Sequence, residues 1–471
     1  MPRSLSAERA APGGPESRGM DLTSWFHRYR FDLAWGAAVA LLVAAAFEVP
    51  HLHLGWLTPV INQTAGQYKV LGATAPILGK WLPHVDWSTA VALTIAVAAV
   101  TGGPVVARVA RWRWLVLGTW ATSLAWAMSL ALIDGWERGF VGHTGGTTGY
   151  LAALPRAKSA SALTREFASH IVAGPGSWHI TVAGDPVGAL LTFFGLERIG
   201  LSGPTWASTF CVLVGTSAVA AVLITVKALS GEQMARRVAP FLAIGPVAIW
   251  IAVSGDAYFG AVAAWGLTLL SLAAARATRF PLMTSLGAGL LLGLSIYLDY
   301  GLILMAIPAV AVLVIARNGQ PLFGALIGAL AVVVTFTAFG FWWLDGLSLV
   351  RQRYWSGIAS NRPYAYWVWG NLASLACAIG VPAATGLRRA FNWTALRSRT
   401  GINLLLVAFV VIIAVADLSG LSKAETERIW LPFSVWLVAA AALLPRGSHR
   451  YCLGLQAVGA LLINSLLLTT W

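Results

Sequence analysis

The 471 residues are too apolar and too sparsely charged for an ordinary soluble protein, because 58% are hydrophobic and 11% are charged, against about 45–50% and about 25% in soluble domains. The mean hydropathy of +0.73 is carried by separate apolar runs that are long enough to cross a bilayer. The formal net charge of +14 comes from Lys and Arg placed between these runs, which fits a positive-inside membrane protein and argues against nucleic-acid binding.

Residues 1–30 form a polar stretch rich in Pro, Gly and Ser that ends in the basic residues His27, Arg28 and Arg30. This composition predicts a disordered cytoplasmic tail. The apolar run that follows, residues 31–47, is long for a secretory signal and lacks a suitably placed small-residue cleavage site, so it predicts an uncleaved span. With the next apolar run it gives two N-terminal transmembrane helices within residues 31–114.

Length and hydropathy predict an all-α polytopic membrane protein with about thirteen transmembrane helices. After the first span, helices are expected near residues 88–107, 115–133, 205–226, 238–254, 257–275, 282–298, 300–316, 321–341, 366–386, 402–418, 430–445 and 451–470. With the N-terminus in the cytoplasm, the short loops rich in Lys and Arg all fall on the cytoplasmic side. Most carboxylates then lie at the outer ends of spans, so we expect a multi-pass protein of the plasma membrane whose active face is outside.

Two long outer segments, residues 134–204 and 342–366, interrupt the core region of residues 115–471. Loops of this length in a compact protein are usually functional. Within the first, residues 161–173 have the spacing of an amphipathic helix lying on the membrane surface. Residues 188–196 are apolar but too short to span, which indicates a re-entrant or interfacial helix.

Asp134 is the first candidate for chemistry, because it ends the third span at the outer interface and is followed by Gly135. A carboxylate at a span exit can remain ionised beside water while it faces a cavity in the bundle, where a general base would lie. The alternative is that Asp134 only ends the helix and meets water. Both interpretations remain open from the residues alone.

The stretch of residues 177–201 carries His179 and Asp185 just before Pro186 and a short apolar helix. These two polar side chains would point into the same cavity if the turn faces the bundle. Alternatively, Asp185 caps that helix, with Pro186 in its first turn.

The second outer segment contains Arg353 and Arg362 interleaved with aromatic residues that include Tyr354. Guanidinium groups at the outer headgroup level suit a phosphate or diphosphate linked to a lipid. The alternative is that they snorkel to the outer headgroups. A third outer stretch, residues 422–433, places Glu427 and Arg428 either beside the cavity, as a phosphate ligand with its orienting partner, or in a solvated turn.

The three cysteines, Cys211, Cys377 and Cys452, lie in or beside apolar runs without a CxxC motif or a Cys/His cluster. We therefore expect neither a disulfide framework nor a metal site.

Several of these segments resemble the GT-C superfamily of polytopic glycosyltransferases, and within it the actinobacterial group that includes methylthioxylose transferase. The resemblance covers roughly residues 115–445 and is moderate in specificity. It is carried by the Asp134-Gly135 pair, by WHITVAGDPVG and SGDAYFGAVAAWG, and by RQRYWSGIASNRPY and ERIWLPF. Residues 185–188 read Asp-Pro-Val-Gly where that group would have His-Pro-Pro-Gly, which leaves the sugar unassigned.

The resemblance implies an inverting transfer from a polyprenyl-phosphate sugar to a cell-envelope glycan or glycolipid, with Asp134 as the catalytic base. It implies that Arg353, Arg362 and Arg428 bind the donor phosphate. Further cavity residues would be His179, Asp185, Asp256, Tyr354 and Glu427. It leaves the need for a divalent cation open, and the sequence has no Gly-rich fingerprint of a nucleotide-sugar site.

A secondary transporter or lipid-linked-sugar flippase is the main alternative. Transporters tend to show internal repeats and mid-membrane ionisable residues in broken helices. Here no repeat is evident, and Asp256 and Asp299 lie at span junctions. A non-catalytic assembly partner is a third interpretation, and a channel is the least favoured.

Overall fold

A computed structural model describes residues 22–59, 62–64, 67–69, 74–146, 149–252 and 254–469. Residues 1–21 of the expected tail lie outside this part of the chain. Helix α1 (Leu22–Glu48) begins before residue 30, so the expected tail boundary is too late. The membrane-length apolar stretch at this end runs over Arg30–Leu52, close to the predicted first span.

The described residues contain 7 helices long and apolar enough to cross a membrane, or up to 9 if each of two bent pairs is one span. The chain thus has the helices of a multi-pass membrane protein. The seven are α1, α2 (Trp87–Val109), α3 (Trp112–Ala131) with η3 (Leu132–Asp134), α9 (Pro204–Thr216) with α10 (Ala218–Ser230), α13 (Gly255–Ala274), α16 (Gln320–Ala338) and α21 (Gly401–Leu418).

Two helix pairs are sharply bent, and the second of them accounts for part of the difference from the thirteen expected spans. Helices α18 (Tyr364–Ile379) and α19 (Val381–Ala390) meet at 106°. Gly380 lies at this bend with a φ of 84°, which a residue with a side chain rarely adopts. The second pair joins α23 (Leu431–Leu437) and η9 (Val438–Leu443) to η10 (Arg446–Ser448) and α24 (His449–Leu466) at 111°. The expected separate spans near 430–445 and 451–470 are therefore one bent unit.

The span expected at residues 238–254 is not formed. Helix α11 (Glu232–Ala243) stops there, and α12 (Ala248–Ile251) is a single turn. Gly245 and Pro246 lie in the break, and Pro246 cannot continue the hydrogen-bond ladder. Helix α14 (Pro281–Ser295) and the unit of η7 (Tyr300–Met305) and α15 (Ala306–Ala316) are apolar but shorter than the spanning helices.

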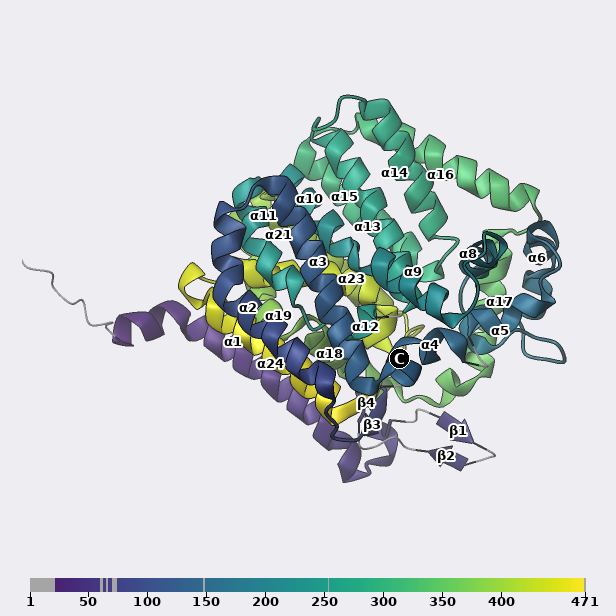
Figure 1. Ribbon diagram of the computed structural model, residues 1–471, viewed down its shortest axis with the longest axis horizontal. Helices are drawn as coiled ribbons and strands as arrows, with labels where there is room; N and C mark the ends of the chain where they lie inside the picture. The colour runs from purple at the N-terminus through teal and green to yellow at the C-terminus, as the bar shows by residue number, and fades with distance from the viewer. Residues whose placement is uncertain are drawn as a thin grey trace, which may run out of the picture.

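Helices α14 and α16 pack through glycines, side by side in Figure 1. Each carries a pair spaced by four residues, Gly289 with Gly293 and Gly324 with Gly328. A Cβ atom at Gly289 would lie 1.9 Å from the carbonyl oxygen of Ala325, so the two backbones are in direct contact. This is the small-residue packing by which transmembrane helices approach closely.

The outward face of α16 is apolar, as expected of a surface against lipid. Phe323, Leu326, Leu330 and Val334 follow one another at helical spacing and are 57–70% exposed. A contiguous apolar stripe of this kind is rare on a soluble monomer.

Arginines with internal partners lie at one end of the bundle. Arg236 donates to the carbonyl oxygens of Ala107, in the last turn of α2, and of Ala110, just after that helix, at 2.8 and 2.9 Å. Arg388 and Arg389 bind Asp32 there, each at 2.5 Å. Because α3 runs from the α2–α3 connection to Asp134, that carboxylate lies at the opposite end.

The predicted first outer segment, residues 134–204, consists largely of short helices. They are η4 (Trp136–Phe140), α4 (Gly142–Gly145), α5 (Tyr150–Ala153), η5 (Leu154–Arg156), α6 (Ala160–Glu166), η6 (Ala168–His170), α7 (Ile180–Ala183) and α8 (Val187–Arg198). The amphipathic helix expected at residues 161–173 is thus divided into α6 and η6. The second outer segment contains α17 (Trp343–Ser356) and η8 (Ile358–Asn361).

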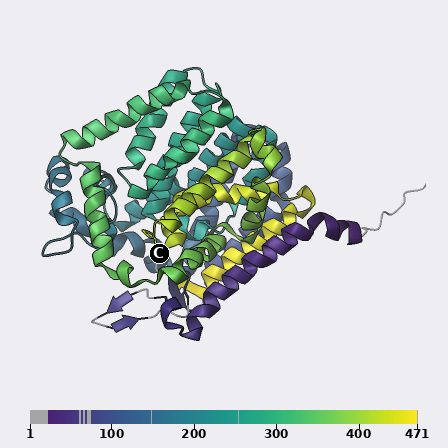
Figure 2. The ribbon, with the colours of Figure 1, turned by 180° about the vertical axis from the view of Figure 1, so that it is seen from behind.

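Four short strands depart from the all-helical expectation. β1 (Asn62–Thr64) pairs with β2 (Gln67–Lys69), and β3 (Gly79–Trp81) pairs antiparallel with β4 (Leu467–Thr469). β4 falls within the predicted last span. Figures 1 and 2 show α1, α2 and α24 side by side, with the strands beyond one end of them. The remaining short helices are η1 (Val49–Leu52), η2 (Gly55–Leu57), α20 (Trp393–Arg397) and α22 (Thr426–Ile429).

Candidate functional site

Asp134 ends the last turn of the α3 span, and the chain turns away at Gly135, whose φ is 81°. One oxygen of the carboxylate, Oδ1, lies 2.5 Å from Nε2 of His84, which comes from the segment between β3 and α2. The side chains of Asp134 and His84 are 11% and 16% exposed. The predicted base is therefore a largely buried carboxylate held by a histidine that the sequence reasoning did not identify.

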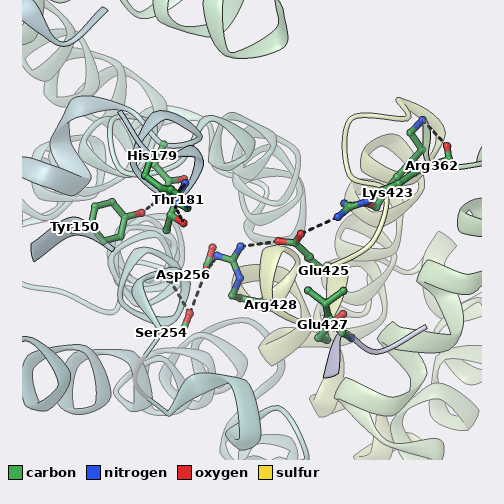
Figure 3. A network of polar contacts seen from close by, with 12 residues as sticks. Tyr150, His179, Thr181, Ser254, Asp256, Arg362, Lys423, Glu425, Glu427 and Arg428 are labelled. Atoms are coloured by element: carbon green, nitrogen blue, oxygen red, sulfur yellow. Dashed lines mark hydrogen bonds and ion pairs between the residues drawn. The ribbon is translucent and has the colours of Figure 1, made fainter. Parts of the chain in front are cut away.

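Arg428 is the centre of a second polar cluster (Figure 3). It forms ion pairs with Asp256 at 2.6 Å and with Glu425 at 3.3 Å. Glu425 also binds Arg362 at 3.2 Å, so one carboxylate bridges two guanidinium groups. Burial by itself lowers the pKa of Arg428, but the charges of Asp256 and Glu425 raise it overall. The sequence predicted Asp256, Arg362 and Arg428 as site residues, and the structure places them in one chain of contacts.

Two further carboxylates act on this cluster. Asp185, at the turn before α8, accepts a hydrogen bond from the hydroxyl of Tyr150. Asp299 accepts one from the backbone N–H of Gly301 at 2.7 Å. Burial and the charge of Asp256 raise the pKa of Asp299 to about 7. Burial and the charges of Asp299 and Asp256 raise the pKa of Asp185 well above its ordinary value. Asp185 and Asp299 therefore bind protons more tightly than ordinary aspartic acids.

Residues 420–428 are held in a constrained conformation that positions Arg428. Ala424 and Glu425 have φ of 70° and 63°, which cost energy for residues with side chains. Neighbouring contacts fix them, because Lys423 Nζ donates to the carbonyl of Arg362 at 2.9 Å and Arg362 Nη1 donates to the carbonyl of Lys423 at 2.5 Å. Burial and the charge of Arg362 lower the pKa of Lys423.

Tyr354 and Arg353 lie on the same turn of α17 but have different partners. The hydroxyl of Tyr354 donates to the carbonyl of Gly420 at 3.2 Å and accepts from the N–H of Lys423 at 3.1 Å, so it supports the Arg428 segment. Arg353 donates to the carbonyl of Ile171 in the first outer segment, at 2.5 Å. Within the described residues it forms no ion pair with a carboxylate.

Glu427 and His179 have local roles that the sequence did not predict. Glu427 is fully buried and accepts from the N–H of Leu78 and from the hydroxyl of Ser374, both at 2.9 Å. It therefore joins the N-terminal segment to α18, while Glu425 is the acid beside Arg428. His179 is exposed and caps α7, its Nδ1 accepting from the N–H of Thr181 at 3.3 Å.

A cavity of about 180 Å³ lies in the first outer segment, apart from the polar clusters. It is lined by residues of η5, α6 and η6 and by Trp178, over whose ring the guanidinium of Arg156 lies at 4.1 Å. In the part of the chain that the structure describes, no group of three or more His, Cys, Asp or Glu side chains is arranged to hold a metal ion.

No protein-family model and no curated protein matches the sequence. Among solved structures, the chain is similar to a crystal structure of the oligosaccharyltransferase of Archaeoglobus fulgidus in complex with zinc and sulfate, with a TM-score of 0.48 and 12% sequence identity. The likeness covers 75% of this chain and 53% of the other, so the chain spans about half the length of the archaeal enzyme. A TM-score of this size does not establish a shared fold, and the roles of the site residues rest on their own geometry.

Proposed function

We propose that the chain is a GT-C-like integral-membrane glycosyltransferase. It would transfer a sugar from a polyprenyl-phosphate donor to a cell-envelope glycan or glycolipid at the outer face of the plasma membrane. The sequence resemblance supports the reaction class. The observation that carries the proposal is the position of Asp134, a largely buried carboxylate at the end of a membrane-length helix. His84 contacts only one of its two oxygens, Oδ1.

In the proposed reaction, Asp134 accepts the proton of an acceptor hydroxyl through Oδ2. This atom makes no hydrogen bond within the described residues. The hydroxyl oxygen bonds to the anomeric carbon while the bond from that carbon to the phosphate oxygen breaks, and the polyprenyl phosphate leaves with the electron pair. The configuration inverts because there is a single displacement. A well-placed base contributes about 10²–10⁴-fold to such a step.

The leaving phosphate needs positive charge, and the three predicted arginines are not equivalent in supplying it. Arg362 and Arg428 are bound to carboxylates, so they would have to exchange partners to bind a phosphate. Arg353 is bound to a neutral carbonyl and keeps its full charge for an anion. We therefore assign Arg353 as the main phosphate ligand, with Arg362 and Arg428 holding Glu425 and Asp256 in place.

The test is transfer of radiolabelled sugar from polyprenyl-phosphate donors in membranes that carry wild type, Asp134→Asn or Asp345→Asn at equal protein levels. Asp345 is an exposed acid of α17 and serves as the control. We expect Asp134→Asn to reduce transfer by about 10²–10⁴-fold and Asp345→Asn to leave it unchanged. Equal transfer by all three proteins would remove Asp134 from the role of base.

A proton-coupled secondary transporter is a second candidate, favoured by the buried acids around Arg428. Ionisable residues inside a membrane bundle often form proton relays, and Asp185 and Asp299 both bind protons more tightly than usual. Absence of transfer from any donor by wild type, with uptake of a lipid-linked sugar into proteoliposomes driven by a pH gradient, would favour this function.

A further inference from the structure

The imidazole ring of His84 faces a hydrogen-bond acceptor at each nitrogen. Nδ1 lies 2.6 Å from the carbonyl oxygen of Leu82, and Nε2 lies 2.5 Å from Oδ1 of Asp134. A carbonyl oxygen can only accept, so Nδ1 carries a hydrogen. A neutral ring would then present a lone pair to the carboxylate. The contact at Nε2 therefore requires one more proton, which lies between His84 and Asp134.

Both members of this pair are fixed by the same short stretch of chain. The N–H of His84 donates to the carbonyl of Ser465 at 2.8 Å, next to the β3–β4 ladder. The side chain of Asn464 donates to the carbonyl of Leu130 at 3.1 Å, one turn before Asp134. Residues 464–465 thus set the positions of the histidine and of the helix end that carries the acid.

We propose that His84 is a positioning residue that shares a proton with Asp134, keeping the carboxylate ionised with Oδ2 directed to the acceptor hydroxyl. This proposal rests on the proposed role of Asp134. A carboxylate that is largely removed from water loses solvation of its charge. A charge-assisted hydrogen bond from an imidazolium replaces that solvation and fixes the orientation of the carboxylate group.

Few other charges act on the pair. Arg138 in η4 faces Asp134, but it is exposed and therefore screened, as is Glu137 beside it. On the side of His84, the carboxylate of Asp86 caps α2 through the N–H of Trp87, and Lys80 in β3 is exposed. His84 is the one titratable group within hydrogen-bond distance of Asp134 in the described residues.

The experiment compares wild type with His84→Gln and His84→Ala. The glutamine amide can still donate to Asp134 but cannot titrate, whereas alanine removes the donor. We expect His84→Ala to lose about 10²-fold in transfer, because a mispositioned base is ineffective. We expect His84→Gln to recover at least a tenth of wild-type transfer.

The pH profile separates this role from a structural one. The alkaline limb of wild type, where the shared proton is lost, should disappear in His84→Gln. The acid limb should move to higher pH in both variants, because the carboxylate loses its cationic partner. Equal losses in the two variants with unchanged pH limbs would overturn the proposal. His51→Gln, at an exposed histidine of η1, is the control.

A measurement without substrate distinguishes failure of this proposal from failure of the proposed function. In protein labelled with ¹⁵N-histidine, the signal absent from His84→Gln belongs to His84. We expect both of its nitrogens to be protonated at pH 8 in wild type, because each faces an acceptor, and the ring to become neutral in Asp134→Asn. A ring that is neutral at pH 8 and insensitive to Asp134→Asn would refute the shared proton, whatever the enzyme activity. A shared proton without transfer would refute the proposed function alone.

Discussion

Replacement of Arg428 by methionine should destabilise the protein in a way that depends on pH. The change removes the partner of Asp256, whose side chain is 8% exposed, and one of the two partners of Glu425. Breaking a buried ion pair costs about 3–5 kcal/mol because a charge remains without compensation. Arg428 itself is 20% exposed, so we expect a loss near the lower value, about 3 kcal/mol in the free energy of unfolding.

The decrease in the free energy of unfolding caused by Arg428→Met should be larger at pH 8 than at pH 5.5. The charge of Arg428 lowers the pKa of Asp185 and of Asp299, so its removal raises the pKa of both carboxyls further above their ordinary values in the folded protein. Stability therefore falls more steeply as the pH rises. Thermal unfolding in detergent, followed by tryptophan fluorescence, measures the difference. Arg351→Met, at an exposed arginine of α17, controls for the loss of a guanidinium. An equal decrease in Tm at both pH values would show that packing is lost and would refute the electrostatic argument.

Two further predictions concern titration and helix packing. The pKa of Asp299 is raised from 3.8 to about 7, so its contribution to stability is full below pH 3.8 and is lost as the pH rises through 7. Asp299→Asn should therefore show a smaller fall in Tm from pH 5 to pH 8 than wild type, and equal slopes would contradict the burial of this carboxyl. Gly289→Ala should lower Tm by several degrees, because its Cβ would lie 1.9 Å from the carbonyl oxygen of Ala325. Gly287→Ala is the control, since its Cβ would meet Leu269 at an ordinary 3.4 Å. Equal Tm values for the two alanine variants would refute the close approach of α14 and α16.

Hydropathy predicted the membrane class and most of the spanning helices. A long apolar segment in a bilayer must pair its own backbone polar groups, and a helix does so. It overestimated the number of spans where a run is interrupted. Pro246 breaks the apolar run at residues 238–254, but one residue changes the mean hydropathy of a window only slightly, so the average does not detect the break. The strand pair of β3 and β4 was not predictable from three-residue segments whose partners are distant in sequence.

The part of the site that could be predicted consists of charged residues in an otherwise apolar sequence. Asp256, Arg362 and Arg428 are ionisable residues next to apolar runs, and the structure brings them together. The partners were not predictable, because they depend on packing between remote segments. Glu427 binds Leu78, and Asp134 binds His84, and both partners come from residues 31–114, outside the predicted core region. The catalytic role of Asp134 remains a prediction.

The pairing of β3 with β4 has a consequence for the order of events during synthesis. Residues 79–84 emerge from the ribosome early, whereas residues 464–469, which hold both His84 and the end of α3, are translated nearly 400 residues later. A nascent chain that has inserted α1 through α21 therefore contains Asp134 and His84 without the segment that aligns them. Under the proposed function, the contact between His84 and Asp134 is therefore expected to form only after residues 464–469 have been synthesised.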